Sequence, residues 1–199
     1  MKNATILVRV LLVLCSVIIS LAGTARAADS SSLKAGVFDP ARMAPEFSLP
    51  ASDGSELNLS RFRGKVVVLG FGFTSCPDVC PITLEVLAQA RRKLGELGNQ
   101  VQVVYVTVDP ERDDAAQMKK YLAAFDPSFI GGTGTEEQLS AVREEYGIMA
   151  QKEVYGESYS FSHSSYTYLI DRDGRLRALM TYGHDAEEFA HDIRILLEE

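Results

Sequence analysis

Residues 65–81 read KVVVLGFGFTSCPDVCP and join a buried strand to a closely spaced pair of cysteines. The apolar, β-branched run at residues 65–71 is bounded by glycines, which is the pattern of a central strand covered on both faces. A helix is expected from Pro81 onward, because proline suits a first helical turn and apolar residues follow at helical spacing. Cys76 and Cys80 therefore lie between a strand and the helix that follows it.

The rest of the sequence alternates strand-like and helix-like segments. Further strands are expected at residues 101–108, 166–170 and 176–182, and further helices at residues 113–125, 135–146 and 185–197. Thr135, followed by Gln138, resembles a capping box, and Asp173-Gly174 between the last two strands predicts a β-hairpin. This order of elements is typical of an α/β protein with a thioredoxin-like fold, a central mixed β-sheet flanked by helices.

The amino-terminal segment predicts export. Residues 1–27 combine a basic end, an apolar run and small residues around a cleavage point, which is the layout of a secretory signal peptide. Residues 4–23 are also long enough to act as an uncleaved membrane anchor. We expect a flexible linker at residues 28–44 and one folded domain at residues 45–199.

The composition is that of a globular protein with a net negative charge. The 199 residues are 46% hydrophobic and 24% charged, which suits one ordinary domain. Twenty basic and 27 acidic residues give a net charge of −7, and no block of Lys and Arg interrupts them. This charge pattern argues against nucleic acid as a partner.

The two cysteines are interpreted as a chemically active pair. A disulfide that closes a loop of only three residues removes little conformational entropy from the unfolded chain, so a purely structural disulfide is disfavoured. The amino end of the following helix favours the thiolate form of both cysteines. Two thiolate ligands select soft metals such as Cu(I) or Zn, and an imidazole as a third ligand would allow the site to bind Cu(II) as well. Both Cys76 and Cys80 precede a proline, which biases them away from helical backbone. Metal binding and disulfide formation both stay open.

Three histidines could supply a third ligand. His191 is expected on a solvated helix face, and His184 at a strand-to-helix junction, where capping is its expected role. His163 lies in the segment 161–165, directly before the strand expected at residues 166–170. In thioredoxin-like folds, the loop that enters this strand passes over the cysteines. From its position alone, His163 is either a metal ligand or a loop histidine bonded to the backbone.

Four motifs resemble the SCO/SenC family of copper chaperones and together span most of residues 45–197. They are FTSCPDVCP at residues 73–81, VTVDPERD at 106–113, FIGGTGT at 129–135, and Ser162-His163-Ser164 leading to YLID at 168–171. The resemblance implies one copper ion per chain, as Cu(I) and as Cu(II), with Cys76, Cys80 and His163 as ligands. Ser162 departs from the family, which often has an acidic residue before the histidine, so a charge that could orient the imidazole is absent.

The resemblance also implies a function in maturing the binuclear copper centre of cytochrome c oxidase, by delivering copper, by reducing the cysteines of that centre, or by both. Cys76 and Cys80 would then also be the redox-active pair, because a dithiol that binds Cu(I) can attack a disulfide. The expected client is the copper-centre subunit of the oxidase or another cuproprotein. A periplasmic copper donor would supply the metal to this chain, or a periplasmic thiol reductant would reduce its cysteines. The expected location is periplasmic or otherwise extracytoplasmic, with attachment to the inner membrane if the first segment is not cleaved.

Other readings of the cysteine motif are an exported thiol–disulfide oxidoreductase, a peroxidase and a binding module. Dedicated thioredoxin-like reductants use C-x-x-C, usually after a tryptophan, whereas this chain has one more residue between its cysteines and no tryptophan. A peroxiredoxin would have threonine three residues before its reactive cysteine, where this chain has Phe73. A structural module with an incidental disulfide is the third alternative.

Three further features have simple structural interpretations. The block DPERD at residues 109–113 is interpreted as a strand-to-helix turn with acidic capping, and its alternative is a partner site or a carboxylate behind the metal ligands. Asp78 is interpreted as a helix cap, with contact to Cu(II) as the alternative. The tyrosines at positions 155, 159, 166 and 168 alternate as strand residues do and need no functional explanation.

Overall fold

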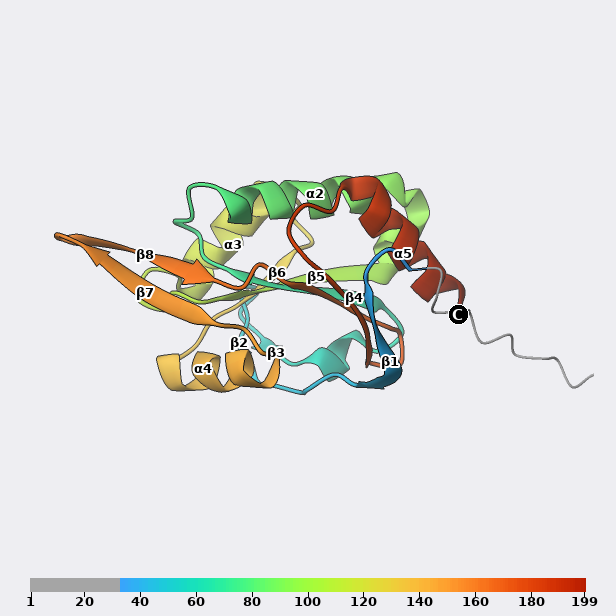
Figure 1. Cartoon of the computed structure of the whole chain (residues 1–199), viewed down its shortest axis with the longest axis horizontal. Helices are drawn as coiled ribbons and strands as arrows, with labels where there is room; N and C mark the ends of the chain where they lie inside the picture. The colour runs from blue at the N-terminus through green and yellow to red at the C-terminus, as the bar shows by residue number, and fades with distance from the viewer. Residues whose placement is uncertain (1–32) are drawn as a thin grey trace, which may run out of the picture.

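The computed structural model describes residues 33–199 (Figure 1). The signal segment predicted at residues 1–27 lies outside the described residues. A six-stranded mixed sheet has the order β1-β10-β9-β4-β5-β6, with β4, β5 and β6 parallel and the other neighbours antiparallel. Its strands are β1 Gly36–Met43, β4 Val66–Gly72, β5 Val101–Thr107, β6 Ile130–Gly132, β9 Thr167–Ile170 and β10 Arg175–Met180.

Helices cover both faces of this sheet (Figure 1). The α-helices are α2 Val79–Lys93, α3 Ala115–Ala123, α4 Glu136–Glu145 and α5 Ala186–Glu198, and the 3-10 helices are η3 Leu59–Phe62 and η4 Gly95–Gln100. In Figure 1, α2 and α5 lie together above the sheet and α4 lies below it. Among residues 33–199, no helix is long and apolar enough to cross a bilayer. The predicted mixed sheet with flanking helices is confirmed.

The core explains why the central strands could be recognised in the sequence. Every residue of β4 and β5 is buried, because helices cover the sheet on both sides. The predicted hairpin is formed by β9 and β10, and Gly174 in its turn has a φ of 81°, which favours glycine. The predicted capping box at the start of α4 is present, with Thr135 and Gln138 bonded to each other's backbone amides.

The expected linker at residues 28–44 needs a correction. Residues 36–43 form β1, which pairs antiparallel with β10 and is therefore part of the sheet. The backbone amides of Lys34 and Ala35 donate to the fully buried carboxylate of Asp192 in α5, which fixes the entry to this strand. The side chains of β1 are almost all exposed, so its sequence lacks the apolar periodicity of a strand and resembles a linker, although its backbone is paired.

Two short strand pairs lie outside the main sheet: β2 Leu49–Pro50 with β3 Glu56–Leu57, and β7 Ala150–Tyr155 with β8 Ser158–His163. The β7–β8 hairpin extends well beyond the main sheet, as the orange arrows in Figure 1 show. Of the four tyrosines expected in strands, Tyr155 and Tyr159 lie on opposite arms of this hairpin and Tyr168 lies in β9, whereas Tyr166 immediately precedes β9. His163 is the last residue of β8, not a loop residue as expected, and it pairs with Ala150.

Candidate metal centre

The cysteine motif lies where β4 passes into α2. After β4 ends at Gly72, the chain turns so that the Cys76 amide donates to the Phe73 carbonyl at 3.3 Å. Cys76 is partly exposed, whereas Cys80 is 1% exposed in the first turn of α2. The bias of Cys80 away from helical backbone is therefore overridden. Pro81 lies in the first helical turn as predicted, where its missing N–H has no intrahelical partner to lose.

Asp78 immediately precedes α2, but its side chain makes no capping hydrogen bond within the described part of the chain. The predicted capping role of this side chain is therefore wrong. The side chain is exposed beside the cysteine loop.

Gly72 and Tyr105, which the sequence does not single out, lie against the Cys80 sulfur. A Cβ atom at Gly72 would lie 2.0 Å from the Tyr105 hydroxyl and 2.8 Å from the Cys80 sulfur, so a side chain cannot fit there. Tyr105 is a buried residue of β5, the strand beside β4. Gly70 and Gly72 were the available signal, because glycines inside a buried strand often mark a close approach of another group.

Burial raises the pKa of the Cys80 thiol to about 12, with a further rise from the neighbouring Cys76, while the Tyr105 hydroxyl and the Phe73 backbone oppose the shift. Desolvation of the charged form therefore outweighs the helix amino end that was expected to favour a thiolate at this position. Cys80 is protonated at neutral pH in the metal-free protein, and any metal that binds its sulfur must displace that proton.

His163 faces this thiol. Its Nε2 atom lies 3.5 Å from the Cys80 sulfur, and its Nδ1 atom lies 3.0 Å from the Ser164 carbonyl oxygen. A carbonyl only accepts hydrogen bonds, so Nδ1 carries the ring proton and the free lone pair is on Nε2, directed toward the sulfur. Burial lowers the pKa of His163, which keeps the ring neutral. The two interpretations of His163, as a metal ligand and as a histidine bonded to the backbone, are therefore compatible. The hydrogen bond from Nδ1 to the backbone leaves Nε2 available as a ligand.

A cavity of about 10 Å³ adjoins this pair and is lined by Cys80, His163 and Tyr105 together with residues of β4, α2 and β9. Such a volume suits about one water-sized guest. Within residues 33–199, no three Cys, His, Asp or Glu side chains form a ready-made metal site. The structure therefore brings Cys80 and His163 together, and Cys76, on the loop that precedes α2, lies close enough to Cys80 to raise the pKa of its thiol.

Comparisons with known proteins show the family to which the chain belongs. Residues 37–198 match the family model described as SCO1/SenC. The chain belongs to the SCO1/SenC family. It is 35% identical over 141 residues to an SCO2-like protein of Rickettsia conorii, covering 69% of this chain and 68% of that protein.

Solved structures of the SCO1/SenC family resemble the chain closely. Copper-bound ScoI of Bradyrhizobium japonicum is 33% identical, with a TM-score of 0.71 over 76% of this chain and 98% of that one. A third relative, BsSco, is described as having a disulfide switch and as a member of the Sco family of cytochrome c oxidase assembly proteins. At 21% identity, with a TM-score of 0.63 over 79% of this chain and 95% of that one, it supports the fold alone. The predicted thioredoxin-like fold is thus confirmed, and the structures that share it include copper-bound members of the SCO1/SenC family.

The DPERD motif of this SCO/SenC chain is a turn, as predicted, but its acids do not cap α3. The cap is Asp114, whose side chain accepts from the Gln117 amide. Asp113 is fully buried and accepts from the Thr74 amide at 2.9 Å, from the Thr74 hydroxyl at 2.6 Å and from the Thr107 hydroxyl at 2.6 Å. This carboxylate therefore ties the cysteine loop to the end of β5.

The other two histidines lie on and beside α5. His184 contacts Glu188 at 3.1 Å, and Glu188 forms the capping box of α5 with Asp185, so His184 adjoins the cap without being it. His191 is a surface residue, as predicted, with its Nδ1 atom 2.8 Å from a carboxylate oxygen of Asp192.

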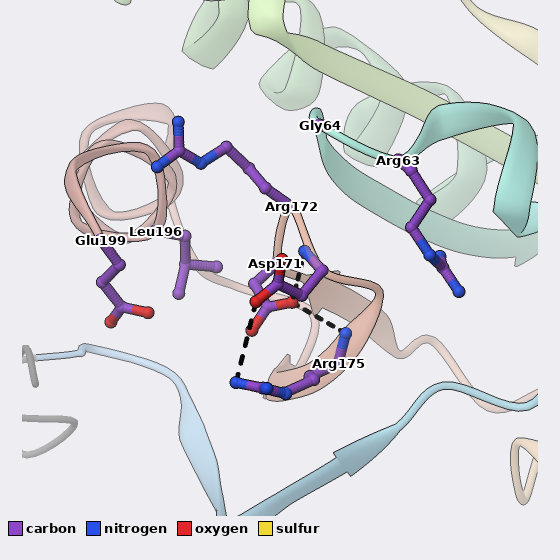
Figure 2. Close-up of a pocket in the computed structure, with 8 residues that line it drawn as sticks. Arg63, Gly64, Asp171, Arg172, Arg175, Leu196 and Glu199 are labelled. Carbon is purple, nitrogen blue, oxygen red and sulfur yellow. Dashed lines mark hydrogen bonds and ion pairs between the residues drawn. The ribbon is translucent and has the colours of Figure 1, made fainter.

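A wide pocket of about 570 Å³ lies at the opposite end of the sheet, where the β9–β10 turn meets the start of β4 and the end of α5 (Figure 2). Three arginines line it together with three acidic residues: Arg63, Arg172, Arg175, Asp171, Asp173 and Glu199. Its charges balance, and its lining includes none of the predicted site residues. This pocket is therefore separate from the candidate metal centre, although it is much larger than the cavity beside Cys80 and His163.

Proposed function

We propose that this chain binds one copper ion through Cys76, Cys80 and His163 and delivers it to the binuclear copper centre of cytochrome c oxidase. The observation that carries the proposal is the position of the His163 Nε2 atom, which faces the Cys80 sulfur at 3.5 Å beside a cavity of about 10 Å³. Membership of the SCO1/SenC family and the likeness to copper-bound ScoI support copper as the cargo.

The proposed donor set suits both oxidation states of copper. Two thiolates are the ligands that Cu(I) prefers, and an added imidazole extends the site to Cu(II). Cys76 would complete the set by a movement of the cysteine loop, whose residues 75, 77 and 78 are exposed. Cys80 gives up its proton when copper binds, whereas neutral His163 has no proton to lose from Nε2.

A second activity, thiol–disulfide exchange, is favoured by the unequal exposure of the two thiols. The partly exposed Cys76 would attack a disulfide of the client, releasing one client thiolate and forming a mixed disulfide. Deprotonated Cys80 would then attack Cys76 and release the second client thiol. The client gains two electrons, this chain is left with a Cys76–Cys80 disulfide, and a separate thiol reductant must restore the dithiol.

The proposed setting follows from the amino-terminal segment. We propose that residues 1–27 direct export, either as a cleaved signal peptide or as an anchor through residues 4–23, and so place the domain outside the cytoplasm. There the client would be the copper-centre subunit of the oxidase or another cuproprotein. A copper donor or a thiol reductant of the same compartment would reload the site.

Copper titration of the reduced protein tests the ligand set. Cu(I) binding is measured by competition with a chelator, and Cu(II) binding by the charge-transfer absorption of a copper–thiolate bond. We expect one equivalent in the native chain, weaker Cu(II) binding in His163→Ala, loss of tight binding in Cys76→Ser, and no change in the control His191→Ala. Equal Cu(II) binding by the native chain and His163→Ala would remove His163 from the set. Disulfide reduction without any copper binding would favour the oxidoreductase.

A further inference from the structure

The proposed histidine ligand is carried by an element that lies outside the main sheet. The β7–β8 hairpin forms a two-stranded sheet of its own, with His163 at its base. An isolated two-stranded hairpin is marginally stable in water, so the position of His163 depends on whatever holds the hairpin against the domain. Metal–ligand distances tolerate only about 0.2 Å of deviation, which makes that support important for a metal site.

Arg112, in the DPERD turn, contacts both the hairpin and the cysteine loop. Its Nη1 atom donates to the Tyr159 carbonyl of β8 at 3.2 Å, and its guanidinium carbon lies 3.9 Å from the centroid of the Tyr159 ring. The same carbon lies 5.9 Å from the ring centroid of Phe73, the first residue after β4. These are distances at which a guanidinium is attracted to an aromatic face.

The turn holds Arg112 in this place. Asp109 is fully buried, and its carboxylate pairs with the Arg112 Nε and accepts from the Tyr159 hydroxyl at 3.0 Å. Beyond them, the ring centroids of Phe73 and Phe161 lie 5.8 Å apart, and those of Phe73 and His163 lie 6.0 Å apart. A continuous set of contacts thus runs from the DPERD turn through the hairpin to the imidazole.

A second link between the turn and the hairpin lies at the surface. Lys152 of β7 pairs with Glu111 at 2.7 Å, but the Glu111 side chain is 64% exposed. Exposed ion pairs contribute little to stability, because water and salt screen them. The contacts that Arg112 and Tyr159 make with the buried Asp109 carboxylate are therefore the stronger attachment of the hairpin.

We infer that Arg112 is a positioning residue, which holds the β7–β8 hairpin so that His163 faces Cys80. The inference rests on the proposed function, since it assigns the support of one ligand in that site. Arg112 acts through His163 and does not itself contact the copper. The DPERD turn therefore has a role beyond changing the direction of the chain, because Asp113 fixes the cysteine loop while Arg112 fixes the histidine that faces it.

A double-mutant cycle tests this inference by Cu(II) titration of the full chain. Arg112→Gln and Tyr159→Leu are each expected to weaken Cu(II) binding roughly tenfold or more, as is usual for residues that orient a ligand. Binding of Cu(I), which two thiolates can hold, should change much less. In a His163→Ala background, Arg112→Gln should cause no further loss of Cu(II) affinity, because the ligand on which it acts is gone.

Arg61→Gln is the matched control. Arg61 also stacks on an aromatic ring, Phe62 at 4.9 Å, and pairs with a carboxylate, Asp53 at 2.7 Å, but it lies before the start of β4 and not after its end. This substitution should leave the affinity for Cu(II) unchanged.

The outcomes separate the inference from the proposed function. If His163→Ala binds Cu(II) as tightly as the native chain, the ligand set itself is wrong. If His163→Ala is weakened but Arg112→Gln and Tyr159→Leu bind as the native chain does, only the positioning role is overturned. Additive losses in the double mutant also overturn it. If both single variants lose their folded circular-dichroism signal, these residues serve the stability of the domain and the inference fails.

Discussion

The Cys80 sulfur and the His163 Nε2 atom lie 3.5 Å apart, although 83 positions separate the two residues in the chain. The contact arises because β9, which follows His163, pairs antiparallel with β4, which precedes Cys80. Gly70 of β4 lies opposite Thr167 of β9, so the end of one strand meets the start of the other. The geometry of the candidate site is therefore a consequence of strand pairing in the central sheet.

Alkylation of the metal-free protein is expected to modify Cys76 before Cys80. The thiolate is the reactive species, and with a pKa of about 12 only about one Cys80 in 10⁴ is ionised at pH 8. Because the thiolate fraction grows tenfold per pH unit below the pKa, the Cys80 rate should still be rising between pH 8 and pH 10. Mass spectrometry of iodoacetamide-treated protein measures both rates, with the guanidinium-unfolded chain as the control. Equal rates in the folded protein would contradict the burial of Cys80.

Replacing Gly72 by alanine should destabilise the domain. The new Cβ would lie 2.0 Å from the Tyr105 hydroxyl and 2.8 Å from the Cys80 sulfur, so we expect a loss of about 1–3 kcal/mol in the free energy of unfolding. Gly36→Ala is the control, because its nearest non-neighbouring atom would be at an ordinary 3.6 Å. Urea unfolding gives both values. Adding Tyr105→Phe to Gly72→Ala should restore part of the loss, and an unchanged stability of Gly72→Ala would argue against this packing.

Asp192→Asn should loosen the start of the sheet. Both carboxylate oxygens of Asp192 accept from the backbone amides of Lys34 and Ala35, and an asparagine would turn an NH₂ group toward one of them. Hydrogen bonds to a buried charge are worth about 1.5–3 kcal/mol, so unfolding should become easier by a comparable amount. Urea unfolding and hydrogen exchange of β1 measure the effect. The exposed Asp173→Asn is the control, and equal stability of the two variants would favour the linker that the sequence predicted.

The sequence predicts the elements whose patterns follow from burial or from turn chemistry. The apolar runs of β4 and β5 reflect covered faces, and Gly174 and Thr135 mark their turn and cap by local chemistry. The strand β1 could not be recognised, since its stability comes from backbone pairing while its side chains face water.

The candidate site was predictable only in part, for related reasons. The two cysteines lie only four positions apart in the chain, and the position of His163 before a strand allowed a role as ligand. Tyr105 resembles any buried aromatic residue in an apolar strand, so its approach to Cys80 is visible only in three dimensions. Arg112 acts through a hairpin that pairs with itself, and no local pattern connects the turn to that hairpin.

Asp113→Asn tests whether the DPERD turn holds the cysteine loop. The buried carboxylate accepts three hydrogen bonds from Thr74 and Thr107, and an asparagine has one acceptor oxygen in place of two. We expect the free energy of unfolding to fall by about 1.5–3 kcal/mol and the amides of residues 74–76 to exchange faster.

Asp114→Asn is the control for this change because it alters the neighbouring carboxylate in the same way. Asp114 caps α3, and asparagine is about as good a cap as aspartate, so little change in stability is expected. Hydrogen exchange measured on both variants separates the two roles. If Asp113→Asn loosened α3 but left the amides of residues 74–76 protected, the carboxylate would serve the helix, and the cysteine loop would have to be held by other contacts.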